Sequence, residues 1–214
     1  MKNSDKIKIF KTYLDQKFPD AKCELIYDKD YELAMAVVLS AQTTDKAVNR
    51  VTPILFKHFD SLQKIAEAPI QDLERDIRAL GLHRHKALSL QKIASLLIDD
   101  FNGIVPSLSS ELLRLPGVGN KTKNVIQAEL FHIPSIAVDT HVERISKRLG
   151  LVRAGDNPDQ IESKIRRLLD ARDYIKTNHQ IISFGREVCL ARKPRCHICE
   201  MKSICSYFKS LNKI

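Results

Sequence analysis

The chain has 214 residues, 43% of them hydrophobic, a size that suits one large domain or two small lobes around a buried core. Its net charge of +9 exceeds what solubility requires and indicates an anionic partner, nucleic acid in the first place. No apolar run approaches about 18 residues, and no large basic amphipathic helix is present, which argues against a membrane span or a membrane surface. Ribosome-associated and RNA-binding proteins share this composition.

Residues 1–18 alternate charged and apolar residues and contain no secretory hydrophobic segment. This pattern predicts a surface helix and a soluble, cytoplasmic protein.

Helical periodicity runs along nearly the whole chain. In residues 84–102, apolar residues recur three or four apart on one face: Ala87, Leu90, Ala94, Leu97 and Phe101. Turn signals such as "FNGIVPS" and "LPGVG" divide the chain into about ten short helices. The run "SIAVD" is the only strand candidate, and we interpret it as a connection. The sequence therefore predicts an all-α protein.

The stretch "RLPGVGNKTKNVI", residues 114–126, predicts a tight turn between two helices. Pro116 ends the first helix, while Gly117 and Gly119 allow a positive φ and the close approach of another backbone. Such a turn directs amide groups outward from the start of the second helix, which predicts an anion site for a nucleic-acid phosphate. The pattern resembles the helix-hairpin-helix motif, and an ordinary αα turn is the alternative.

Lys121 follows this hairpin, at the positive end of the next helix dipole, where a lysine is unfavourable. A solvated lysine that contacts phosphate is one interpretation. A nucleophile is the other, since an amine attacks carbon only when unprotonated and a lysine with a pKa of about 10.4 is almost wholly charged. The helix start, partial burial and the neighbouring Lys123 would all disfavour the ammonium form.

The stretch "VDTHVERISKRLG" begins another predicted helix. Asp139 or Thr140 is suited to cap it, and Thr140 with Glu143 matches a capping box. A carboxylate such as that of Asp139 can also help to generate a free amine, or stabilise positive charge on a sugar. Both roles stay open at this point.

Four of the five cysteines fall within 17 residues and are separated by six, two and five residues: Cys189, Cys196, Cys199 and Cys205. Such clustering favours metal ligation over disulfides in a chain without an export signal. Structural zinc usually uses paired C-x-x-C segments, and only one such pair is present, with His197 inside it as a predicted solvent-facing residue. Four thiolates also suit an iron–sulfur cluster. We expect Cys23 to be a buried core thiol.

The hairpin segment, the "AVDTHVERISKRLG" segment and the cysteine spacing together resemble the endonuclease III family of bifunctional DNA glycosylase/AP lyases. The segments "VVLSAQTTDKAVNRVTPILF" and "IRALGLHRHKA" match as well, so the resemblance covers residues 25–208. It implies a two-lobed all-α enzyme with its active site in the cleft. Residues 23–132 would form a helical barrel with the hairpin, and residues 1–22 plus 133–214 a helical domain with one [4Fe–4S] cluster.

The resemblance also implies roles for single residues. Lys121 would attack C1′ of the damaged nucleotide, displace the base and, through a Schiff base, cut the strand by β-elimination, with Asp139 as the second essential group. The base would leave the stack, Gln42 would fill the gap, and Leu82 would wedge the opposite strand.

For the cysteines, the resemblance implies that all four ligate one [4Fe–4S] cluster. The segment "LARKPR" between the first two carries Arg192, Lys193 and Arg195. A solvated basic loop is one interpretation, and the resemblance implies a phosphate-binding surface. The expected partner is double-stranded DNA with oxidised or saturated pyrimidines or abasic sites, bound by a monomer that works on the nucleoid.

Two other functions stay open. Adenine glycosylases share the hairpin and the cluster, but they lack the lysine and carry an additional C-terminal domain, whereas this chain ends soon after Cys205. A basic iron–sulfur protein that only binds DNA would have no use for Lys121 and Asp139. The chain departs from the family at Leu113, where some members have glutamate, and at Lys123, where alanine is frequent.

Overall fold

The computed structural model describes residues 1–211, which are helical throughout their regular structure and contain no strand. The prediction of an all-α protein is confirmed, and residues 135–139 form a connection. The α-helices are α1 (Asn3–Lys17), α2 (Asp30–Leu39), α3 (Asp45–His58), α4 (Leu62–Glu67), α5 (Ile70–Asp76), α6 (His83–Phe101), α7 (Ser109–Leu112), α8 (Asn120–Phe131), α9 (Thr140–Leu149), α10 (Pro158–Arg166), α11 (Tyr174–Glu187) and α12 (Ser206–Leu211). Two 3-10 helices, η1 (Ala171–Asp173) and η2 (Glu200–Ser203), complete the list.

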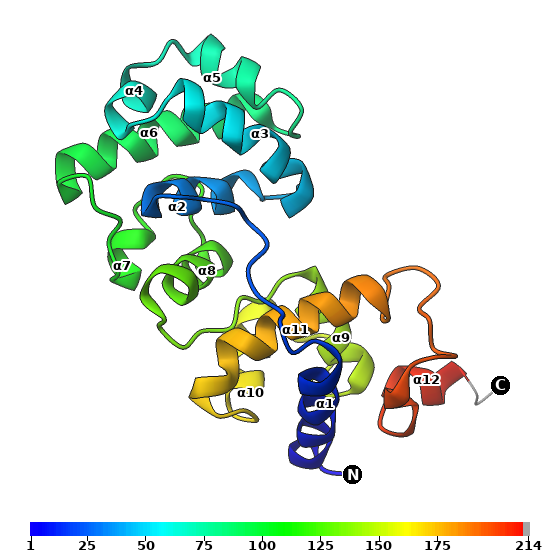
Figure 1. The fold of residues 1–214 in the computed structure, drawn as a ribbon. Coiled ribbons are helices and arrows are strands. Elements are labelled where there is room, and N and C mark those ends of the chain that lie inside the picture. The colour runs from blue at the N-terminus through cyan, green and yellow to red at the C-terminus, as the bar shows by residue number, and fades with distance from the viewer. Residues whose placement is uncertain (212–214) are drawn as a thin grey trace. The chain divides into compact units, whose positions relative to one another are not determined.

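The chain divides into two compact units (Figure 1). We call residues 24–131, with α2 to α8, the hairpin unit. Residues 1–23 together with 132–214 form the other, which we call the cysteine unit. No helix within residues 1–211 is both long and apolar enough to cross a membrane.

Helix α2 is the centre of the hairpin unit. Eight consecutive residues of it, 32–39, are buried, as expected for a helix that is apolar on every side. It begins where the Glu32 carboxylate accepts hydrogen bonds from the backbone N–H groups of Asp28 (2.9 Å) and Lys29 (3.3 Å). Helices α6 and α8 both pack on α2, and α4 and α5 pack on α6. The hairpin before α8 is therefore built directly on the core of this unit.

Aromatic packing around Phe184 forms the centre of the cysteine unit. This ring, on α11, meets Phe10 and Tyr13 of α1 edge to face, with centroids 5.2 and 5.8 Å apart. The predicted N-terminal helix is confirmed as α1, and one of its faces is buried against α11. Because α11 ends at Glu187, this packing also fixes the start of the cysteine segment.

Candidate functional site

The hairpin turn, residues 113–119, joins α7 to α8 and depends on one glycine in particular. Gly117 has a φ of +83°, and a Cβ there would lie 2.9 Å from Cγ1 of the buried Val38. Gly119 does not have a positive φ, and a Cβ on it would meet nothing within 4 Å. The prediction of a positive φ is therefore confirmed for Gly117 and wrong for Gly119. Gly119 directly precedes α8, and its carbonyl oxygen accepts a hydrogen bond from the backbone N–H of Lys123 (2.9 Å).

Lys121 is the second residue of α8 and is exposed. The face of α8 that packs inward carries the next residue, Thr122, and Asn124, so the side chain of Lys121 lies outside the core. The expectation that Lys121 is partly buried is therefore wrong. The first turn of α8 contains no acidic residue. The lysine thus meets the positive end of the helix with no carboxylate in that turn to offset it.

Asp139 is the N-cap of α9. Its Oδ1 accepts hydrogen bonds from the backbone N–H groups of His141 and Val142, both at 2.8 Å. Because the helix begins at Thr140, the predicted capping box of Thr140 with Glu143 does not form, and Glu143 pairs with Lys147 instead (2.6 Å). The other carboxylate oxygen, Oδ2, takes no part in the cap. One side chain therefore both starts the helix and presents an oxygen whose position the cap fixes.

Gln42 and Leu82 are both exposed, and both have a left-handed backbone, with φ of 54° and 61°. Leu82 immediately precedes α6 and is 54% exposed. A bulky residue with positive φ costs on the order of 1–3 kcal/mol, and such strain gathers at functional positions. Lys193, in the basic segment, is also left-handed (φ 48°) and exposed. Three of the five non-glycine residues with positive φ within residues 1–211 are thus ones that the sequence analysis selected.

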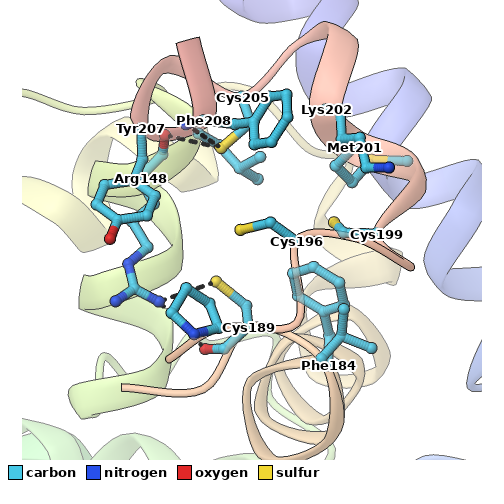
Figure 2. A pocket seen from close by; sticks show the side chains of 13 residues that line it. Arg148, Phe184, Cys189, Cys196, Cys199, Met201, Lys202, Cys205, Tyr207 and Phe208 are labelled. Atoms are coloured by element: carbon cyan, nitrogen blue, oxygen red, sulfur yellow. Dashed lines mark hydrogen bonds between the residues drawn. The ribbon is translucent and has the colours of Figure 1, made fainter. Parts of the chain in front are cut away.

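The four clustered cysteines line a single pocket of the cysteine unit, about 410 Å³ with open solvent included. Figure 2 shows their sulfur atoms facing the same space, with Phe184 and Met201 beside them. Burial raises the pKa of the thiols of Cys199 and Cys205, and these two side chains would hold iron as thiolates. Cys23 is only half-buried, in the segment that follows α1, so the prediction of a core thiol is wrong.

The donor set fits an iron–sulfur cluster better than a zinc ion. Zinc needs four ligands about 2.3 Å from one point, and no group of three or more His, Cys, Asp or Glu in residues 1–211 is arranged to hold a single metal ion. Four soft sulfur ligands around a wider space suit a cluster of several irons. His197 is exposed, as predicted, and its carbonyl oxygen accepts a hydrogen bond from Nζ of Lys202 (2.7 Å).

Two arginines of α9 hold the first cysteine and the basic segment after it. Arg148 donates to Sγ of Cys189 (3.3 Å) and to the carbonyl oxygens of Leu190 (2.6 Å) and Ala191 (2.9 Å). Its guanidinium also lies over the ring of Tyr207, 4.7 Å from the centroid (Figure 2).

Arg144, one turn earlier on α9, donates to the carbonyl oxygens of Cys189 (3.2 Å) and Gly185 (3.1 Å). Burial lowers the pKa of this guanidinium, which stays charged at any physiological pH. The segment with Arg192, Lys193 and Arg195, all exposed, is thus fastened at its base. The sequence analysis missed Arg144 and Arg148, because "ERISKRLG" reads as an ordinary basic helix face; their only sequence signal is a spacing of four residues.

Two family models match the chain. One, described as HhH-GPD superfamily base excision DNA repair protein, covers residues 35–171, and the other, the iron-sulfur binding domain of endonuclease III, covers residues 189–205. The endonuclease III of Bacillus subtilis (strain 168) is 43% identical over 205 residues, which is 96% of this chain and 94% of that protein. The chain belongs to the endonuclease III family.

Other comparisons within the endonuclease III family agree. The Escherichia coli (strain K12) endonuclease III is 36% identical over 196 residues, 92% of either chain. A solved structure of a trapped endonuclease III–DNA covalent intermediate, an estranged-adenine complex, matches with a TM-score of 0.95 at 42% identity and covers 99% of both chains. The chain is therefore a base-excision DNA repair enzyme, a bifunctional DNA glycosylase and AP lyase that carries a [4Fe–4S] cluster. The predictions of family, enzyme class and cluster are confirmed.

Proposed function

We propose that the enzyme removes oxidised or saturated pyrimidines from duplex DNA and cuts abasic sites, with Lys121 as nucleophile. The observation that carries this proposal is the place of Lys121: exposed, directly after the hairpin, in a first helical turn without acidic residues. A nucleophilic amine must be able to reach the sugar, and this position leaves the side chain of Lys121 accessible beside a predicted phosphate-binding turn.

The reaction begins when the unprotonated Nζ of Lys121 attacks C1′ of the flipped nucleotide. The bond between C1′ and the base breaks, and the base leaves with the electron pair and takes a proton. The sugar ring then opens to a Schiff base between Nζ and C1′. Loss of a proton from C2′ expels the 3′ phosphate by β-elimination, and water finally hydrolyses the Schiff base and frees the lysine.

Asp139 is proposed as the carboxylate that stabilises positive charge on the sugar and receives protons during these steps. The two cap hydrogen bonds to Oδ1 fix the side chain, so that it needs no reorganisation during the reaction.

Four groups are proposed to hold the DNA. Gln42 fills the gap left by the flipped nucleotide, and Leu82 enters beside the opposite strand. The backbone at Gly117 and Gly119 contacts phosphate, as does the basic segment with Arg192, Lys193 and Arg195. The cluster, held by Cys189, Cys196, Cys199 and Cys205, stiffens this segment and needs no redox turnover. We place the enzyme in the cytoplasm, as a monomer that works on the nucleoid.

Borohydride trapping on duplexes with one thymine glycol or one abasic site tests this proposal. The reagent reduces a Schiff base to a stable protein–DNA bond, so the unaltered enzyme is expected to give a covalent adduct on both duplexes. Lys121→Gln should abolish the adduct, and Lys92→Gln, an exposed lysine of α6, should not. Full trapping by the Lys121 variant would overturn the assignment.

A further inference from the structure

Lys86, on α6 of the hairpin unit, is a buried lysine without an acidic partner. It is only 5% exposed, and within residues 1–211 it forms no ion pair. Burial lowers the pKa of its ammonium group. Its Nζ donates one hydrogen bond, of 2.8 Å, to the hydroxyl oxygen of Thr43. This arrangement is unfavourable, because a buried charge normally requires a carboxylate or several hydrogen bonds. A methionine would fill the same space without that cost.

The ammonium group of Lys86 connects the segment that contains Gln42 to the segment that contains Leu82. Thr43 directly follows Gln42, and its own N–H is bonded to the carbonyl oxygen of Ser40 (3.1 Å). The backbone N–H of Lys86 donates to the carbonyl oxygen of Leu82 (3.0 Å). One residue therefore holds, through its side chain, the segment with Gln42 and, through its backbone, the segment with Leu82.

Both of the residues so connected are strained. Gln42 and Leu82 have positive φ values, and such backbones persist only where the surrounding structure enforces them. Leu82 precedes α6 without any side-chain cap, so local sequence does not fix its conformation. The hydrogen bond from Lys86 to Thr43 ties one strained segment to the other.

We propose that Lys86 is a positioning residue, which holds Gln42 and Leu82 at a fixed spacing so that both enter the duplex together. This inference rests on the proposed roles of Gln42 and Leu82 in DNA. Without the tie each segment relaxes on its own, and the protein must order both of them during nucleotide flipping. Lys86 touches no reacting atom, so its loss affects the flipping step and leaves the chemistry of an already flipped nucleotide unchanged.

The test combines single-turnover base excision with stopped-flow fluorescence of 2-aminopurine placed opposite a thymine glycol, which reports unstacking. Lys86→Met should slow both the fluorescence change and excision on the order of 10- to 100-fold. Its melting temperature should be no lower than that of the unaltered enzyme, because the methionine removes an unfavourable buried charge, and its absorbance near 400 nm should be unchanged. Lys86→Arg, which keeps a charged donor, should restore most of the rate.

Substitutions of Thr43, the hydrogen-bond acceptor, test the same interaction from its other partner. They remain informative even if the Lys86 variants fold poorly. Thr43→Val removes the hydroxyl acceptor and should slow flipping, whereas Thr43→Ser keeps the hydroxyl and should not. The double variant Lys86→Met/Thr43→Val should be no slower than Lys86→Met alone, since both changes remove one interaction. Strictly additive losses, or a Thr43→Val enzyme that flips at the normal rate, would overturn the proposal.

Two further variants separate this inference from the proposed function. Gln42→Ala and Leu82→Ala should each slow the fluorescence change. If neither does, the inserting roles fail, and the role of Lys86 fails with them. If both do while Lys86→Met and Thr43→Val flip normally, only the role of Lys86 is wrong.

Discussion

Gly117 lies so close to Val38 that a Cβ on the glycine would stand 2.9 Å from Val38 Cγ1. The tight turn of the hairpin therefore rests directly on the buried helix α2. A turn fixed on the core holds the start of α8, and with it Lys121, in one place. Gly119, two residues later, has open space around it and an ordinary backbone.

This contrast predicts different effects of alanine at the two glycines. Gly117→Ala combines a left-handed backbone with a clash against Val38, and we expect a loss of about 2–4 kcal/mol in the free energy of unfolding. Gly119→Ala should change it by less than about 1 kcal/mol, because neither strain nor a clash arises. If Gly119 faces phosphate as proposed, this second variant should still bind DNA more weakly. Urea unfolding and a DNA titration measure both effects, and equal losses of stability would contradict the account.

Two substitutions of Asp139 separate its role as N-cap of α9 from its proposed role in catalysis. Asparagine is an equally good N-cap but carries no charge, so Asp139→Asn should unfold like the unaltered enzyme and lose most base excision. Asp139→Ala should lose the cap as well, at about 0.5–2 kcal/mol. Urea unfolding and excision kinetics of the two variants give the comparison. Normal base excision by Asp139→Asn would show that Asp139 caps α9 and has no role in catalysis.

These roles show what the sequence can and cannot predict. The cysteine ligands were predictable, because all four lie within one short window whose spacing is itself the signal. The cap by Asp139 was one of two candidates, and the choice depends on which residue begins α9, a boundary that side-chain types leave uncertain by one or two residues. The left-handed backbones of Gln42 and Leu82 were not predictable, because neither residue type favours that conformation and tertiary contacts impose it.

The contacts of Arg148 could not be predicted from the sequence either, since its partners lie about 40 residues further along the chain. A basic residue on a polar helix face has many possible partners, and only the fold selects one. The burial of Lys86 could not be predicted for the same reason, because Lys86 follows the polar segment "HRH". Sequence therefore predicts groups that act through local spacing, and it misses those that act across the fold.

Arg148 should govern how well the cluster is retained. Arg148→Met removes bonds to Cys189, Leu190 and Ala191 and the contact with Tyr207, and hydrogen bonds from charged donors contribute about 1.5–3 kcal/mol each. We expect the variant to lose iron several-fold faster to a chelator, measured as absorbance near 400 nm. The matched control is Arg166→Met, since Arg166 lies over Tyr174 (5.4 Å) in the same unit and pairs with Glu162. Equal iron loss from both variants would refute the prediction.

The basic segment with Arg192 and Lys193 should contribute to the salt dependence of DNA binding. Each phosphate contact contributes about 0.9 to the slope of log K against log salt concentration, so Arg192→Ser or Lys193→Ser should reduce the slope by about that amount. Arg172→Ser, at an exposed residue of η1 near Asp170 (3.7 Å), should leave it unchanged. Titrations of one lesion duplex at several salt concentrations supply the slopes. A slope that is unchanged in both basic-segment variants would remove this segment from the DNA contacts.

The central claim is that one amine, Nζ of Lys121, bonds to the sugar. Peptide mapping by mass spectrometry of the borohydride-trapped adduct tests it most directly, because it locates the reduced deoxyribose on a single residue. The account predicts that the sugar mass is found on Lys121, with Lys123 and the N-terminal amine unmodified. A sugar on either of those two amines, in an adduct formed at the normal rate, would contradict it.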